Sequence, residues 1–162
     1  MPGMDAADLW VESYQGEVLG EALFGAMAER EDQPERRRQL EVLTLLERAT
    51  KELAEPVFER RGFDRGDTEK TLADASELAD AVAHMAWDEF LASIPPVTVN
   101  FLAKYRQLVD LATDPQEREI AQAYVAHEEA LASFAHRCLG EEAGDPLERI
   151  LALPHVAAAA AA

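Results

Sequence analysis

Three residues of metal-ligand type interrupt apolar stripes that have helical spacing. Glu17 lies near the middle of the first stripe, Glu47 near the middle of the second, and His127 near the middle of a late one. A charged side chain on a buried helix face is costly unless it is paired or bound to a metal ion. Carboxylate and neutral imidazole are ligands that suit iron, manganese or zinc. The pattern therefore predicts that the three side chains converge inside a helical bundle and hold at least one ion.

For any one of these residues, a chance position on the apolar face of a helix is a simpler explanation than a metal site. With 32 acidic residues in 162, an inward-facing glutamate is common, and an ion pair or exposure to solvent would account for it. What favours a site is that all three residues lie at the same height, because the midpoints of long packed helices come together.

Four further residues are weaker candidates. Glu21 and Glu128 lie at the edges of their stripes and are as well placed for solvent as for the site. Tyr124, one turn before the late histidine, is suited to donating a hydrogen bond to a metal ligand. His84 lies on a later helical segment, where a hydrogen-bonded interface histidine is the plainer interpretation. His136 near a helix end, His155 in the tail and the lone Cys138 are given no catalytic role.

The elements that must position these residues are all helical. Between a few clusters of glycine and proline, the chain is rich in Ala, Leu, Glu and Arg, with apolar residues three and four apart. The predicted helices run from about Asp5 to Glu31, from Pro34 to Arg61, from Asp67 through Phe90 to a stop at Pro95-Pro96, from about Val97 to Ala112, from Asp114 to Leu139, and briefly after Asp145-Pro146. The proline pair is expected to be the firmest boundary, because proline breaks a helix interior.

The length fits one domain with a real core. We expect residues 1–143 to form the bundle and residues 144–162 to form a short terminal helix and an Ala-rich tail without function. Gly16, Gly20 and Gly25 on the first helix suggest close approach of a neighbouring helix or a local bend. Self-association into a homodimer through that helix is a further expectation.

Composition narrows the function classes. The formal charge of −17 disfavours nucleic acid and anionic membrane surfaces as partners. A single cysteine excludes an internal disulfide framework and indicates a reducing, cytoplasmic compartment. The segment Met1–Leu9 lacks a long apolar run, so neither a signal peptide nor a membrane span is expected there.

Over about residues 8–140 the chain resembles the ferritin-like superfamily, whose members usually carry Glu, Glu-x-x-His, a further Glu and Glu-x-x-His around a di-iron or di-manganese centre. Glu17–Phe24 looks like the first-helix glutamate followed by an aromatic residue. Glu47–Thr50 looks like the second motif with threonine in the histidine position, and Tyr124–His127 looks like the last with tyrosine in the glutamate position. Small bacterial ferritin-like proteins of unassigned role share a stretch like Ala126–Leu131.

The resemblance implies a four-helix bundle with a crossover helix between two antiparallel pairs. Helix direction favours the Asp67 helix as the crossover, since the first and last long helices are then parallel. The inner Val97–Ala112 helix would then offer only Asn100, Lys104 and Gln107 as polar candidates. If the Asp67 helix were the inner one, Glu77, Asp80 and His84 would become available. Either way, the chain offers about half the ligands of a complete di-metal centre.

Three functions follow from these observations. The leading one is a metal-binding ferritin-like protein with iron or manganese as cofactor, acting as an oxidoreductase on an unidentified small molecule or as an iron-handling protein. The alternative is a metal-free helical bundle that binds a small ligand or a protein. A third is a haem-oxygenase-like di-metal oxidase, which Asp80-x3-His84 and Glu129-x6-His136 would suggest.

Overall fold

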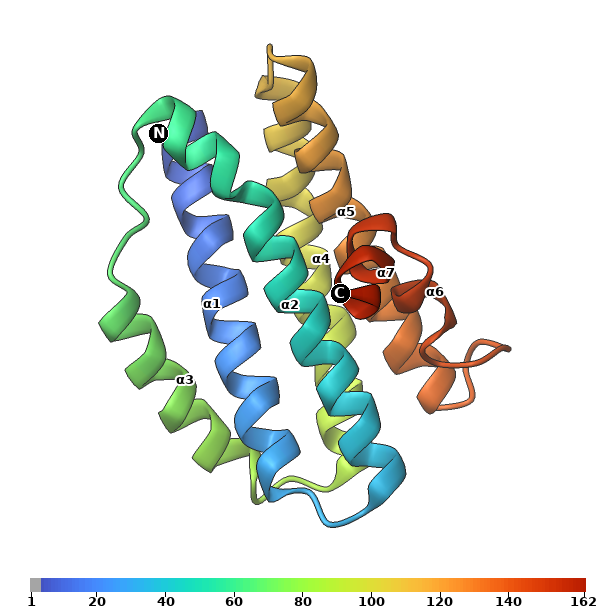
Figure 1. The fold of residues 1–162 in the computed structure, drawn as a ribbon. Helices are drawn as coiled ribbons and strands as arrows, with labels where there is room; N and C mark the ends of the chain where they lie inside the picture. The colour runs from blue at the N-terminus through green and yellow to red at the C-terminus, as the bar shows by residue number, and fades with distance from the viewer. Residues whose placement is uncertain (1–3) are drawn as a thin grey trace.

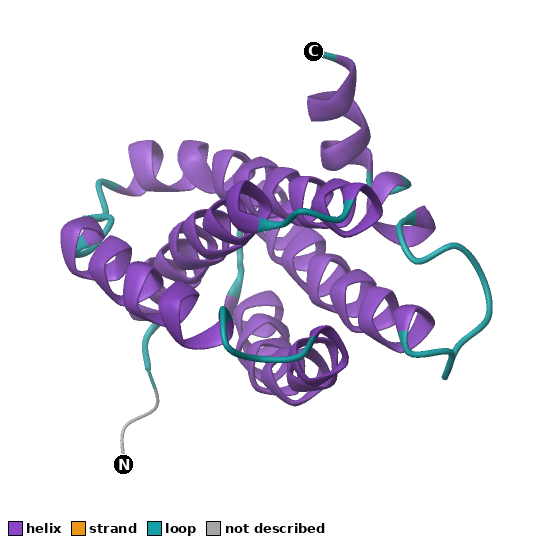
Figure 2. Cartoon of the chain, turned by 90° about the horizontal axis from the view of Figure 1, so that it is seen from below, coloured by secondary structure: helices purple, strands orange, loops and turns teal. Residues whose placement is uncertain are grey.

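The computed structural model of the chain describes residues 4–162. It contains seven α-helices: α1 (Ala6–Arg30), α2 (Pro34–Arg61), α3 (Thr68–Val82), α4 (Trp87–Leu111), α5 (Pro115–Cys138), α6 (Glu148–Leu151) and α7 (Pro154–Ala161). No strand occurs within the described residues, which confirms the all-α fold (Figure 2). Residues 1–3, the start of the segment in which no targeting signal is expected, lie outside the description. None of the helices in residues 4–162 combines the length and the apolar character needed to cross a membrane.

Four long helices form two antiparallel pairs, α1 with α2 and α4 with α5 (Figure 1). The chain passes from the first pair to the second through α3, which packs along the outer side of α1. As a result α1 and α5 run in the same direction, and α4 is the inner helix of the second pair. This answers the topological question that the sequence left open.

Local sequence signals explain most of the helix boundaries. The Asp114 side chain accepts a hydrogen bond from the Glu117 N–H, and Pro115 occupies the first turn of α5, where no partner for its nitrogen is needed. Gly62 ends α2 in the left-handed conformation, with φ of 65°, which glycine adopts without a steric penalty. Both boundaries agree with the sequence prediction.

The boundary expected at Pro95-Pro96 is wrong. The chain leaves the helix at residues 83–86, and the proline pair lies inside α4, so Val97 does not begin a helix. Buried Leu91 and Ile94 hold the helix against the bundle on one side, while Pro96 is exposed on the other. Apolar packing along one face of α4 thus overrides the local cost of two missing amide donors.

The bundle has two apolar clusters, one toward each end. The first contains Leu43 and Phe134, and the second contains Val57 and Tyr124. Along α1, α2 and α5, the changeover between the clusters falls at the central polar residues. A layer of buried polar side chains therefore separates two apolar cores.

The C-terminal segment, residues 144–162, packs onto this bundle. Leu147, Ile150 and Val156 are buried in the first cluster, and α7 lies against α2. The Ala-rich tail forms the last turns of α7, which point away from the bundle (Figure 2). Docking of α7 is what brings its first residues close to the central layer.

Candidate metal centre

Glu17, Glu47 and His127 meet in the central polar layer. One potential ligand atom from each residue lies within 4.8 Å of the other two. Their exposed fractions are 1%, 5% and 0%, so all three side chains are removed from solvent. The structure thus brings together the three residues that the sequence singled out, from α1, α2 and α5.

The His127 imidazole lies between the carboxylates. Its Nδ1 atom is 3.5 Å from Oε2 of Glu17, and its Nε2 atom is 3.4 Å from Oε1 of Glu47. A third carboxylate, that of Glu128, has its Oε1 atom 3.7 Å from the same Nε2 atom. Two distinct groups of oxygens therefore surround the two ring nitrogens.

The hydroxyl of Thr50 determines which ring nitrogen of His127 carries a proton. Thr50 Oγ1 donates its only proton to the Leu46 carbonyl at 2.8 Å, so it must accept from its other neighbours. Those neighbours are His127 Nδ1 and His155 Nε2, each at 2.9 Å. With Nδ1 as the donor, the neutral imidazole of His127 keeps a lone pair on Nε2.

Several buried polar atoms of the centre have no hydrogen-bond partner among the described residues. They are Oε2 of Glu17, Nε2 of His127 and the hydroxyl oxygen of Tyr124. Leaving such a group unpartnered costs about 1 to 3 kcal/mol, so native structures normally satisfy it. Two of these atoms belong to the metal-ligand residues, which is what an ion-binding centre requires.

Electrostatics show that the centre has a surplus of negative charge. Burial and the charge of Glu47 raise the pKa of the Glu17 carboxyl well above its ordinary value. Burial also raises the pKa of Glu128 to about 7, although the charge of His127 opposes this. Burial lowers the pKa of His127, but the charges of Glu47 and Glu128 outweigh it and leave that pKa raised. Without a cation, protons must neutralise the carboxylates.

Gly20 makes room for the Glu47 carboxyl group. A Cβ atom at this position would lie 2.5 Å from Cδ of Glu47, closer than any real contact. At Gly16, a Cβ would lie 3.3 Å from the Phe101 ring of α4. Because α1 is continuous, these glycines serve close approach and not a bend. Both positions face neighbouring helices of the same chain. Self-association through α1 stays a prediction.

Only two of the four weaker candidates lie in the centre. Tyr124 and Glu128 are buried at the centre. Glu21 lies outside it, where it pairs with Arg48 and Lys51 at the surface between α1 and α2. Its expected place near the apolar stripe therefore does not make it a ligand.

His84 does not belong to the centre. It lies exposed in the turn after α3, because α3 is the outer crossover helix. The neighbouring Asp80 pairs instead with Arg30 of α1. Glu129 is exposed, with Arg106 at 3.7 Å, so the two pairs of the haem-oxygenase-like hypothesis do not face one cavity.

The sequence analysis missed two residues beside the centre, His155 and Tyr105. His155 was placed in a tail without function, yet it is hydrogen-bonded to Thr50, and burial lowers its pKa to about 4. Tyr105 of α4 is almost fully buried and stacks edge-on against Tyr124, with ring centroids 5.0 Å apart. His155 was missed because it lies in an Ala-rich segment. Tyr105 was missed because it lies on an ordinary apolar stripe.

The three residues of the centre come from α1, α2 and α5, and α4 contributes none of them. At the level of the polar layer it presents Thr98, Phe101 and Tyr105, and no carboxylate among the described residues comes from it. Comparison with known protein families, with curated proteins and with solved structures gave no match to this chain. Any functional conclusion must therefore come from the centre itself.

Proposed function

We propose that the chain binds one transition-metal ion through Glu17, Glu47 and His127. The observation that supports this most strongly is the unpartnered Nε2 atom of His127, which lies beside two carboxylates with its lone pair free. Two carboxylates and a neutral imidazole balance the charge of a divalent ion. Iron or manganese bound there would supply redox or Lewis-acid chemistry.

The surrounding residues would fix this ligand set. Thr50 holds the imidazole in one orientation and one tautomer by accepting the Nδ1 proton of His127. Gly20 lets the carboxyl group of Glu47 lie directly against α1. Apolar clusters flank the ligand set toward both ends of the bundle. These contacts support a prearranged site rather than an accidental meeting of acidic side chains.

The proposal places the chain with ferritin-like metal proteins of the oxidoreductase or iron-handling kind. Two antiparallel helix pairs joined by a long crossover support this assignment, as does a ligand set in the bundle interior. The missing α4 carboxylate favours one ion over two, and the small-molecule substrate is left open.

A metal-free bundle is the second candidate, and one observation favours it. A doubly protonated His127 would place a positive charge between Glu47 and Glu128 and would balance part of the cluster without any ion. In that case the centre would be a structural polar network, and the chain would serve as a binding module.

Metal content separates the two candidates. The protein is purified after growth with iron or with manganese, and metal per chain is measured by elemental analysis. We expect about one ion per wild-type chain, and at least a tenfold fall in Glu47→Ala and His127→Ala. The controls are Glu129→Ala and His136→Ala, which change residues of the same types on α5, the first exposed and the second half-buried near the end of the helix. Full metal content in the first two variants, or none in the wild type, would contradict the proposal.

A further inference from the structure

An apolar cavity of about 400 Å³ lies between α1 and α4, with the end of α3 at its rim. Its walls include Leu23, Phe24 and Ile94. At its mouth, Leu78 and Val97 are exposed by 39% and 52%. A volume of this size lies in the range of small-molecule binding sites.

The inner end of this cavity is acidic. Glu17, Glu47 and Glu128 all line it, and Oε2 of Glu17 is buried there without a hydrogen-bond partner. Among the described residues that line the cavity, none is Lys, Arg or His. An apolar passage therefore leads to carboxylates that no basic residue of its own wall neutralises.

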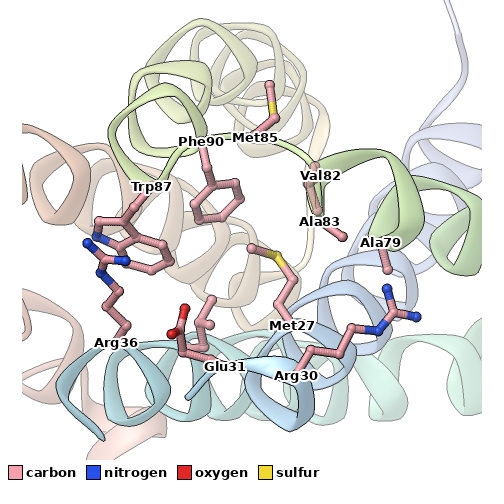
Figure 3. A pocket seen from close by; sticks show the side chains of 11 residues that line it. Met27, Arg30, Glu31, Arg36, Ala79, Val82, Ala83, Met85, Trp87 and Phe90 are labelled. Carbon is pink, nitrogen blue, oxygen red and sulfur yellow. The ribbon is translucent and has the colours of Figure 1, made fainter. Parts of the chain in front are cut away.

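A second, smaller cavity differs in character. It has a volume of about 180 Å³ and is lined by Arg30 and Arg36, with the Arg36 guanidinium 5.3 Å from the centre of the Trp87 ring (Figure 3). Val82, Met85 and Phe90 line both cavities. Arg30 and Arg36 therefore line the smaller cavity and not the larger one.

We propose that the larger cavity binds a primary amine with an apolar body, whose ammonium group lies against Glu128. The apolar body would occupy the passage between α1 and α4. This inference goes beyond the proposed metal site, because Glu128 is not one of its three ligands. An ion would balance Glu17 and Glu47 and would leave the Glu128 carboxylate as the group available to a ligand.

Charge and hydrogen bonding select the amine. Within the described residues Glu128 makes no hydrogen bond, and its nearest basic atom is Nε2 of His127 at 3.7 Å. An ammonium group carries a positive charge and three donors, whereas an alcohol has one donor and a carboxylate would be repelled. The apolar walls require the rest of the ligand to be apolar.

The test compares four ligands that differ in head group or chain length. Metal-depleted protein is titrated at pH 8 by calorimetry with n-octylamine, n-butylamine, 1-octanol and octanoate. We expect octylamine to bind at least tenfold more tightly than octanol, and octanoate not to bind. Butylamine should bind on the order of 100-fold more weakly than octylamine, because burial of each methylene contributes about 0.8 kcal/mol.

Two variants locate the ammonium group. Glu128→Gln should abolish the preference for octylamine over octanol, whereas Glu129→Gln, a change at the exposed neighbouring position, should preserve it. Equal affinities of octylamine and octanol for the wild type would overturn the proposal, and so would an undiminished preference in Glu128→Gln. The head-group comparison needs no variant, so it stands even if Glu128→Gln does not fold.

Metal loading separates this inference from the metal proposal. After reconstitution with Mn(II), octylamine should still bind, because its partner Glu128 is not a ligand. Displacement of octylamine by the ion would place both on the same carboxylates and would overturn the amine site while supporting the metal site. If no ion binds, the metal proposal fails, and the titration of the metal-depleted chain still decides the amine site.

Discussion

The two ring nitrogens of His127 have different environments, and this difference gives the centre its chemistry. Nδ1 is committed to the hydroxyl of Thr50, while Nε2 lies unpartnered beside the oxygens of Glu47 and Glu128. A hydrogen bond to one nitrogen fixes the tautomer and makes the other a better ligand. The Thr50 hydroxyl is thus as much a part of the centre as the side chains that would bind an ion.

Replacing this hydroxyl should weaken metal binding. Thr50→Val keeps the shape of the side chain but removes the acceptor of the His127 Nδ1 proton, so we expect Mn(II) affinity to fall about 10- to 100-fold. Thr44→Val is the matched control, because Thr44 donates the same kind of hydrogen bond to a carbonyl one turn earlier in α2, that of Leu40, and makes no hydrogen bond to a histidine among residues 4–162. Equal Mn(II) affinities for the two variants, measured by calorimetry, would show that Thr50 does not orient the ligand.

Two glycines of α1 allow a similar comparison. Gly20→Ala places a Cβ atom against the Glu47 carboxyl and should lower Mn(II) affinity at least tenfold by displacing it. Gly25→Ala meets only Thr44 Cγ2 at an ordinary 3.8 Å, so it should leave affinity unchanged. It should also raise the free energy of unfolding by about 0.5 to 1 kcal/mol, because alanine favours the helix. Wild-type affinity in Gly20→Ala would contradict the assigned role of Glu47.

The convergence of Glu17, Glu47 and His127 could be predicted from sequence, because each interrupts a long apolar stripe near the middle of its helix. The burial of Glu128 could not, because it follows a central residue and its side chain turns inward only beside the cavity. The hydrogen bond of His155 depends on how α7 docks, and no local pattern encodes that.

At the scale of elements, the strongest helix-breaking signal in the sequence, the pair Pro95-Pro96, does not end a helix. Pro95 and Pro96 remove two amide donors from α4, yet the helix continues because its buried face packs against the bundle. The true break after Val82 has no proline or glycine nearby. Local propensity predicted α1, α2 and α5 well, because their caps and their packing agree, and it failed where the two conflict.

Removing one proline should therefore stabilise the protein. Pro96→Ala restores an amide donor for the Ala92 carbonyl at an exposed position of α4. We expect the free energy of unfolding to rise by about 2 kcal/mol, since the helix cost of proline is about 3 kcal/mol and the freer unfolded chain offsets up to about 1 kcal/mol. Urea unfolding of the wild type and of Pro96→Ala measures this difference in the free energy of unfolding. A loss of stability would mean that the proline pair sets a bend that the packing of α4 requires.

At the scale of the whole molecule, the carboxyls of the central layer and the carboxyls paired with arginine respond oppositely to pH. The buried Glu17 and Glu128 have raised pKa values, so the folded metal-free chain holds protons that the unfolded chain releases. Carboxyls paired with arginine, such as the half-buried Glu55 and the buried Glu117, have lowered pKa values and stabilise the fold only while they are ionised. Stability of the metal-free protein should therefore be greatest near pH 5.

A pH series of urea unfolding with a chelator tests this. Glu128, with a pKa of about 7 against an ordinary 4.5, should by itself cost about 3 kcal/mol of stability as the pH rises from 4.5 to above 7. The sign follows because a group with a raised folded pKa stabilises the fold below its unfolded pKa and loses that effect as pH rises through the folded value. Glu128→Gln should flatten the curve. Equal stability at pH 5 and pH 8 in the wild type would refute the assignment.

The most direct test of the central claim is anomalous X-ray diffraction from crystals grown with excess Mn(II). We predict one strong anomalous peak per chain between the side chains of Glu17, Glu47 and His127, at about 2.0 to 2.3 Å from their ligand atoms. His127 should contribute Nε2, with Nδ1 still directed at Thr50. A map without a peak among these three side chains, or with Mn(II) only at surface carboxylates, would contradict the claim that this centre binds metal.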